Sequence, residues 1–208
     1  LESVVIPDSV TSIGNEAFFR CSSLQSVIIP NSVTSIARDT FNMCTSLESV
    51  VIPNSVTSIG QDAFYMCTSL ESVVIPDSVT SIGNEAFDQC SSLQSVIIPN
   101  SVTSIGERAF HGCTLKSVVI PDSITSIADH TFSSSSIESV VIPDSVTSIG
   151  NWAFKENHIK SINIPDSVTF IGRGNFYRCF NLQSVVIPDG VTSIEPALFS
   201  GDAALKSV

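Results

Sequence analysis

The chain has 208 residues, of which 43% are hydrophobic and only 14% are charged, and its formal net charge at pH 7 is -11. This apolar content is enough for a continuous core, so we expect a single domain covering residues 1–208. The acidic balance argues against charge-driven binding of nucleic acid or anionic lipid, and Pro and Ser interrupt the apolar runs long before the ~20 residues that a membrane-spanning helix needs.

One pattern repeats along the whole chain at intervals of 22 or 23 residues: Leu-x-Ser-Val-Val-Ile-Pro-Asp/Asn-Ser-Val-Thr-Ser-Ile-Gly-x-x-Ala-Phe-x-x-Cys-x-x. A fixed period of this length predicts a solenoid, in which each repeat forms one coil and stacks on its neighbours. We expect nine coils and the start of a tenth, as a segment of a longer array. The copies start at Leu1, Leu24, Leu47, Leu70, Leu93, Leu115, Ile137, Ile159, Leu182 and Leu205.

Each coil is expected to open with a short strand, as in the second repeat. Leu24, Val27 and Ile29 follow a Leu-x-x-Leu-x-Leu pattern in which all three side chains point into the rod. Pro30 should end this strand because proline cannot donate to a sheet ladder, and Asn31 follows as a turn-forming residue. Strands of successive coils would then form one parallel face.

The return side of the second repeat begins with Val33 and Ile36, while Thr34 and Ser35 point outward. The Ala-Phe pair that follows in most repeats predicts a short helical turn that places the Phe in the core. Stacked rings at this position should form a spine that dominates the stability of each coil. The Phe is present in all nine coils, at Phe18, Phe41, Phe64, Phe87, Phe110, Phe132, Phe154, Phe176 and Phe199.

The motif Ile-Pro-x-Ser-Val-Thr-x-Ile-Gly-x-x-Ala-Phe-x-x-Cys-x-x-Leu resembles the BspA-like (Treponema pallidum type) leucine-rich repeat over the whole chain. The resemblance implies a right-handed leucine-rich repeat solenoid with a parallel strand face and helical turns on the return side. It also implies a secreted or surface-anchored protein of a bacterium or protist that adheres to host proteins or to other cells, and it supplies no catalytic residues. Departures from the motif gather late, at Asn163, Phe170, Gly174, Asn175, Glu195 and Pro196.

An outward-facing strand position carries Val or Ile in eight of nine coils, with Asn163 as the exception. One interpretation is strand propensity on a sheet surface. The other is a partner-binding stripe, since a contiguous exposed apolar strip usually marks an interface. The candidate partner-binding residues are Val5, Ile28, Val51, Val74, Ile97, Val119, Val141 and Val186.

The position two residues before the Phe is acidic in the first four coils, at Glu16, Asp39, Asp62 and Glu85. Stacked carboxylates could share a weakly bound calcium ion, which prefers oxygen ligands. Alternatively, they are solvated side chains placed favourably at the start of a helical turn. The same position then changes to Arg108, His130 and Trp152, which could make a cation–π contact and are a second candidate partner-binding site.

A cysteine occupies one position in six coils, and Ser135, Asn157 and Asp202 replace it in the others. Replacement by Ser and Asn indicates a hydrogen-bonding role on a buried turn, so we expect a reduced ladder rather than disulfides or a metal site. The cysteines are Cys21, Cys44, Cys67, Cys90, Cys113 and Cys179.

We predict no enzyme activity and no cofactor, because His111, His130 and His158 occupy three different repeat positions and the glycines occur singly. The predicted function is protein binding or cell adhesion through the strand face, by an extracellular or cell-surface protein. The alternative is a structural protein whose solenoids stack end to end or laterally into a filament, since the repeats are nearly identical. A minor alternative is ice binding by the threonine column, Thr11, Thr34, Thr57, Thr80, Thr103, Thr125, Thr147, Thr169 and Thr192.

Overall fold

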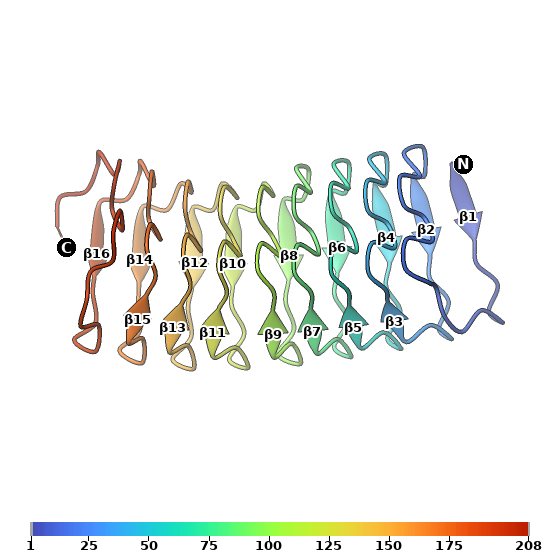
Figure 1. Ribbon diagram of the computed structural model, residues 1–208, viewed down its shortest axis with the longest axis horizontal. Helices are drawn as coiled ribbons and strands as arrows, with labels where there is room; N and C mark the ends of the chain where they lie inside the picture. Colours follow the sequence, from blue (N-terminus) through green and yellow to red (C-terminus); the bar gives the residue numbers. More distant parts are fainter. Residues whose placement is uncertain (1, 208) are drawn as a thin grey trace.

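The computed structural model describes residues 2–207, so the repeat start predicted at Leu1 and the final Val208 lie outside the described residues. The chain winds into a row of stacked coils that runs from the N-terminus at one end of the molecule to the C-terminus at the other (Figure 1). The predicted solenoid with parallel strands is confirmed. We number the coils 1–9 by their repeat starts, so that coil 2 begins at Leu24 and coil 8 at Ile159.

A three-residue strand opens each coil, and these strands form the first strand face. Ladder pairing is parallel and in register with the repeat, so that Ser26 lies beside Ser49 and Val27 beside Val50. Each repeat position therefore becomes a column of equivalent residues along the rod. The strands are β1 (Ser3–Val5), β2 (Ser26–Ile28), β4 (Ser49–Val51), β6 (Ser72–Val74), β8 (Ser95–Ile97), β10 (Ser117–Val119), β12 (Ser139–Val141), β14 (Ser161–Asn163) and β16 (Ser184–Val186).

A two-residue strand on the return side forms a second, narrower face. It is present in coils 2–8, whereas coils 1 and 9 have irregular backbone at this position, so seven of the nine predicted coils carry both strands. The buried Ile in these strands anchors the face to the core. The strands are β3 (Ser35–Ile36), β5 (Ser58–Ile59), β7 (Ser81–Ile82), β9 (Ser104–Ile105), β11 (Ser126–Ile127), β13 (Ser148–Ile149) and β15 (Phe170–Ile171).

Turns form the third side, which we call the wall of turns; it comprises residues 15–20 of coil 1 and their equivalents. The helical turns predicted here are wrong, because residues 2–207 contain no helix, and hence none that could cross a bilayer. In coil 3, Asp62 and Met66 each have a φ of 54°, which breaks right-handed helical progression. The N–H of Phe64 consequently donates to the carbonyl of Ala86 in the next coil, 2.8 Å away.

The predicted phenylalanine spine is confirmed. Successive rings stack in parallel, with centroids 5.2 Å apart between Phe64 and Phe87 and 6.5 Å apart between Phe154 and Phe176. The spine side chains of coils 2–8 are completely or almost completely buried. Each ring of coils 2–8 therefore packs on the rings of both neighbouring coils, and the core is one continuous rod.

The cysteine column lies at the edge of this core. The thiol of Cys67 donates to the carbonyl of Phe41 in the preceding coil, and the hydroxyl of Ser135 makes the equivalent bond to Phe110 at 2.7 Å. The amide of Asn157 continues the series. The predicted hydrogen-bonding role is therefore confirmed, and all six cysteines are free.

Candidate interaction surfaces

Aliphatic side chains cover the outer surface of the first strand face. In β6, Val73 points inward and is 5% exposed, whereas the adjacent Val74 is 77% exposed. In-register pairing aligns the equivalent residues into one line, which we call the aliphatic stripe. Its members are the eight predicted residues, Val5, Ile28, Val51, Val74, Ile97, Val119, Val141 and Val186.

Small polar side chains border the aliphatic stripe. Ser72 in β6 and Ser95 in β8 are ladder partners and are both exposed, as are their equivalents in the other first-face strands. Serine adds little height to the surface, so a flat partner could approach the backbone and the Val and Ile side chains together. Asn163 in β14 is exposed as well and interrupts the stripe in coil 8.

A groove opens in this face between β8 and β10. These strands belong to different sheets, and no hydrogen-bonded ladder joins them. The groove has a volume of about 360 Å³. The side chains of Ile97 and Val119, two members of the aliphatic stripe, line it. The other lining residues are Ser95, Val96, Ile98, Asn100, Ser117 and Pro121.

This groove was not predicted from the sequence. Its one available signal is the change of period from 23 to 22 residues between the repeat starts at Leu93 and Leu115. That change alone is not sufficient, because the ladder is also interrupted between β4 and β6, where the period stays at 23 residues.

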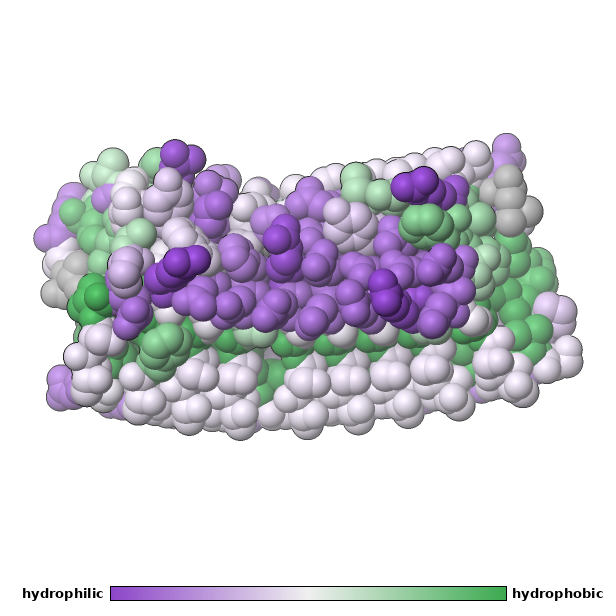
Figure 2. Space-filling model, viewed as in Figure 1, coloured by the Kyte–Doolittle hydropathy of each residue, from purple (hydrophilic) through white to green (hydrophobic). Residues whose placement is uncertain are grey.

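The wall of turns carries the most varied side chains of the molecule. A hydrophilic band runs along the middle of the side shown in Figure 2. At the position after the spine Phe, the residue changes type in almost every coil, whereas the strands repeat Ser and Val. The column reads Phe19, Asn42, Tyr65, Asp88, His111, Ser133, Lys155, Tyr177 and Ser200.

Two of the three residues predicted as a local site on this wall are in contact. The rings of His130 and Trp152 stack with centroids 6.4 Å apart and an interplanar angle of 19°. Among residues 2–207, Arg108 does not lie over the Trp152 ring, and its Nε donates to Asp88 Oδ2 at 3.1 Å. The cations over the Trp152 ring are instead Lys155 and Arg173, at 5.8 and 5.7 Å from the centroid.

Coil 8 completes this aromatic and basic cluster. Tyr177 meets Trp152 edge-on, with 5.5 Å between ring centroids, and Arg178 lies 5.1 Å over the Tyr177 ring. Glu156 lies 3.6 Å from both the Lys155 ammonium and the Arg178 guanidinium. These residues were not predicted from the sequence, although Lys155 and Tyr177 belong to the variable column that follows the spine Phe.

Two histidines lie next to this cluster. Burial lowers the pKa of His111 and of His130, and the nearby Arg108 guanidinium lowers both further. His111 Nδ1 also lies 2.6 Å from Ser133 Oγ, within hydrogen-bonding distance. Both imidazoles are therefore neutral at pH 7, and they add polarity to the wall without adding charge.

The acidic column of coils 1–4 does not form a metal site. Asp39 accepts a 2.9 Å hydrogen bond from Arg38. Glu16, Asp62 and Glu85 adopt the left-handed backbone conformation in turns, so they do not stand at helix starts. Among residues 2–207, no three His, Cys, Asp or Glu side chains are grouped so as to hold a metal ion. The structure therefore does not support the predicted calcium site.

The threonine column is exposed on the second strand face. The hydroxyl of Thr80 donates to the carbonyl of Thr57 at 3.2 Å, and the hydroxyl of Thr103 donates to that of Thr80 at 3.3 Å. These bonds give the repeated threonine a structural role along the rod. Ice binding stays a prediction.

A family model described as the BspA type leucine-rich repeat region matches residues 1–113 and 80–206. A leucine-rich repeat protein of Bacteroides ovatus is 37% identical and has a TM-score of 0.91. The match covers 98% of this chain but 54% of that protein, so the chain spans about half the length of this relative. A leucine-rich repeat protein of T. pallidum is 30% identical over 88% of this chain and 78% of its own, with a TM-score of 0.67.

A leucine-rich repeat protein from Eubacterium ventriosum shares the fold, with 24% identity and a TM-score of 0.62 over 100% of this chain and 66% of its own. A search of curated proteins found no match.

Proposed function

Because the chain belongs to the BspA-type leucine-rich repeat family, we propose that it is a non-enzymatic binding protein whose first strand face docks a protein partner. The observation that carries the proposal is the aliphatic stripe, whose side chains are 56% exposed at Val141 and up to 90% exposed at Val5. Apolar groups aligned in this way are unusual on a surface that meets only water. An extracellular or cell-surface location and a role in adhesion, both implied by the family resemblance, are part of the proposal.

The face suits a flat, extended contact with a local anchor. Val and Ile side chains supply apolar area, and the bordering serines, such as Ser72 and Ser95, offer hydroxyl groups at the rim. The groove between β8 and β10 is large enough to receive an apolar side chain of the partner between Ile97 and Val119. Such a buried anchor typically carries much of the binding energy.

Lateral assembly of the solenoids into a filament is the second candidate, favoured by the uniformity of the same face. The stripe presents Val51, Val74 and Ile97 at equivalent positions, so two copies could pack face to face in more than one register. A dedicated binder would be expected to vary more along this face.

The test of the proposed function is a double substitution, Val74→Asp with Val119→Asp, measured by surface plasmon resonance against a panel of purified extracellular matrix proteins. The matched control is Ser104→Asp with Ser126→Asp, which adds the same charge at exposed positions of the second strand face. We expect binding that the stripe variant loses and the control retains. Binding to none of the proteins, or equal binding by both variants, contradicts the proposal, and light scattering in parallel detects filaments.

A further inference from the structure

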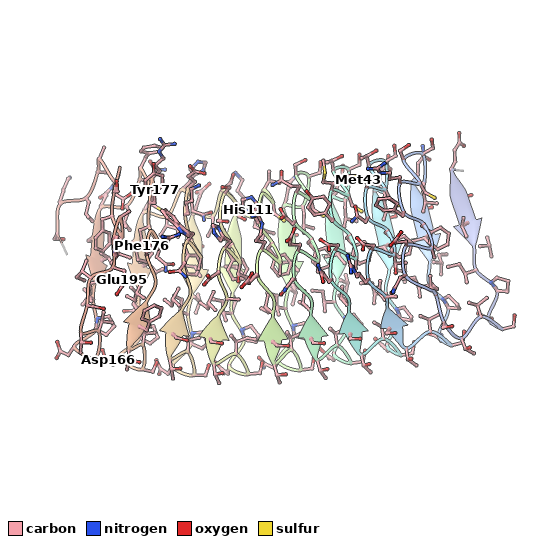
Figure 3. All side chains as sticks on the ribbon, viewed as in Figure 1. Met43, His111, Asp166, Phe176, Tyr177 and Glu195 are labelled. Carbon is pink, nitrogen blue, oxygen red and sulfur yellow. The ribbon has the colours of Figure 1, made fainter. Side chains whose placement is uncertain are left out.

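The wall of turns carries a negatively charged region in coils 3 and 4 and a positively charged region in coils 7 and 8. In coils 3 and 4 it carries Asp62 and Glu85, which we call the acidic pair. In coils 7 and 8 it carries Lys155, Arg173 and Arg178, which we call the basic triad. In Figure 3, Met43 of coil 2 lies toward the N-terminal end of the rod and Tyr177 of coil 8 lies toward the C-terminal end.

The acidic pair has no cationic partner in the described part of the chain. The ion pairs among residues 2–207 involve other carboxylates, those of Asp39, Asp88 and Glu156. Burial raises the pKa of Asp62, and the negative charges of Glu85 and Asp39 raise it further. The pair is therefore a patch of mutually repelling carboxylates that an external cation would stabilise.

Aromatic rings hold the basic triad in place. Lys155 and Arg173 lie over Trp152, and Arg178 lies over Tyr177, so the three cations are ordered before any partner arrives. Glu156 is the one carboxylate paired with the triad among the described residues, which leaves an excess of positive charge. Because His130 and the cations cover the faces of Trp152, the ring is not a free platform for stacking a sugar.

The two charged regions are placed symmetrically along the rod. Coils 3 and 4 are as far from the boundary between coils 5 and 6 as coils 8 and 7 are. A twofold axis through the wall at this boundary would place Asp62 opposite Arg173 and Arg178 of a second copy, and Glu85 opposite its Lys155. We propose that a second copy of this chain binds antiparallel through the wall of turns, with each acidic pair facing the other copy's basic triad.

The centre of the wall adds no attraction to this arrangement. Near the axis, the charge of Arg108 is neutralised by Asp88, whose side chain is 1% exposed, and His111 and His130 are neutral at pH 7. Glu107 of coil 5 and Asp129 of coil 6 would approach each other across the axis, and their repulsion opposes the attraction between the acidic pair and the basic triad. The contact is polar and lies between two chains of net charge -11, so it is a weak and salt-sensitive one.

The test uses two charge-reversal variants, examined by sedimentation velocity over a concentration series in 0.15 M NaCl. The first variant combines Arg173→Glu with Arg178→Glu, and glutamate occurs naturally in these columns at Glu107 and Glu156. The second is Asp62→Lys, in a column where Arg108 has the same positive φ, and it leaves Glu85 opposite Lys155 of the other copy. We expect the unmodified chain to dimerise, each variant alone to bind itself at least tenfold more weakly, and an equimolar mixture to form heterodimers.

The mixture is the decisive arm, because antiparallel pairing of the two variants restores opposite charges at both contacts. The control is Lys116→Glu with Lys160→Glu, which changes the net charge as much as the first variant but lies next to β10 and β14; it should dimerise normally. The proposal is overturned if the unmodified chain stays monomeric, if the variants dimerise unchanged, or if the mixture stays monomeric. Self-association abolished by Val74→Asp with Val119→Asp instead would assign it to the aliphatic stripe and would also overturn the proposal.

Discussion

The indole ring of Trp152 lies directly over Gly174 of the next coil, where a Cβ atom would overlap the ring. Both residues occupy the same repeat position, and Gly174 has a φ of 62°. Glycine is therefore needed here for space as well as for backbone conformation. The late departure from the motif at Gly174 is explained by the large ring in the preceding coil.

Replacing Gly174 with Ala should displace Trp152 from its stack with His130 and destabilise the fold by more than ~1 kcal/mol. The chain has one Trp, so its fluorescence spectrum reports this site alone. Gly14→Ala is the control, because nothing lies within 4 Å of a Cβ built there. An unchanged spectrum and an unchanged denaturation midpoint for Gly174→Ala would contradict the packing described.

The phenylalanine spine gives a stability prediction. Phe87 is fully buried and stacks between Phe64 and Phe110, so Phe87→Ala leaves a cavity and should lower the free energy of unfolding by ~3–5 kcal/mol. Phe180, which is 57% exposed, provides a matched control whose substitution by Ala should change stability by less than ~0.5 kcal/mol. Urea denaturation monitored by circular dichroism distinguishes the two, and equal effects would show that the spine does not dominate.

The cysteine column gives a prediction about hydrogen bonding. Cys67→Val keeps the site apolar but removes the thiol bond to the Phe41 carbonyl, which then accepts only from the Cys44 N–H, and this should cost ~0.5–1.5 kcal/mol. Cys67→Ser should cost less, because Ser135 makes the equivalent bond naturally. Urea denaturation of the two variants checks this order. A valine variant as stable as the serine variant would mean that the thiol bond contributes little.

Asp202 gives a pH prediction. It occupies the cysteine position of coil 9, where burial raises the pKa of its carboxyl to about 7 even though the N–H of Cys179 donates to it. Its Oδ2 is buried without a hydrogen-bond partner. Since the folded pKa is above the ordinary value of 3.8, the folded state binds the proton more tightly, and stability should fall as pH rises from about 4 to about 7.

Asp202→Asn should remove this pH dependence and stabilise the protein above pH 7. Asn157 shows how an amide fits the position, since its Oδ1 accepts from the Ile137 N–H and its Nδ2 donates to the Phe132 carbonyl. Denaturation midpoints of both proteins at pH 5 and pH 8 check the prediction. Parallel shifts in the two proteins would place the titrating group elsewhere.

Much of the fold could be predicted from the sequence because each coil repeats the same apolar positions. The period placed Phe87 and Val73 inside and Val74 outside, since alternation along a strand follows from local geometry. Substitution of Cys by Ser and Asn at one position was enough to predict the hydrogen bonds of Cys67. The local pattern was sufficient to predict these features, because they depend only on which residues are adjacent to a given repeat position in the neighbouring coils.

The backbone conformation of the wall of turns and the side-chain contacts of its sites follow only from the tertiary structure. Asp62 and Trp152 adopt positive φ although neither is glycine, because stacking lets alternate N–H groups of the wall donate to the next coil, and this offsets the local strain. The contacts of Trp152 with Arg173, and the groove between β8 and β10, depend on side-chain directions and on ladder spacing across coils. A repeat motif determines which coils are neighbours. These sites depend in addition on how the side chains of residues more than 20 positions apart in the chain pack against one another.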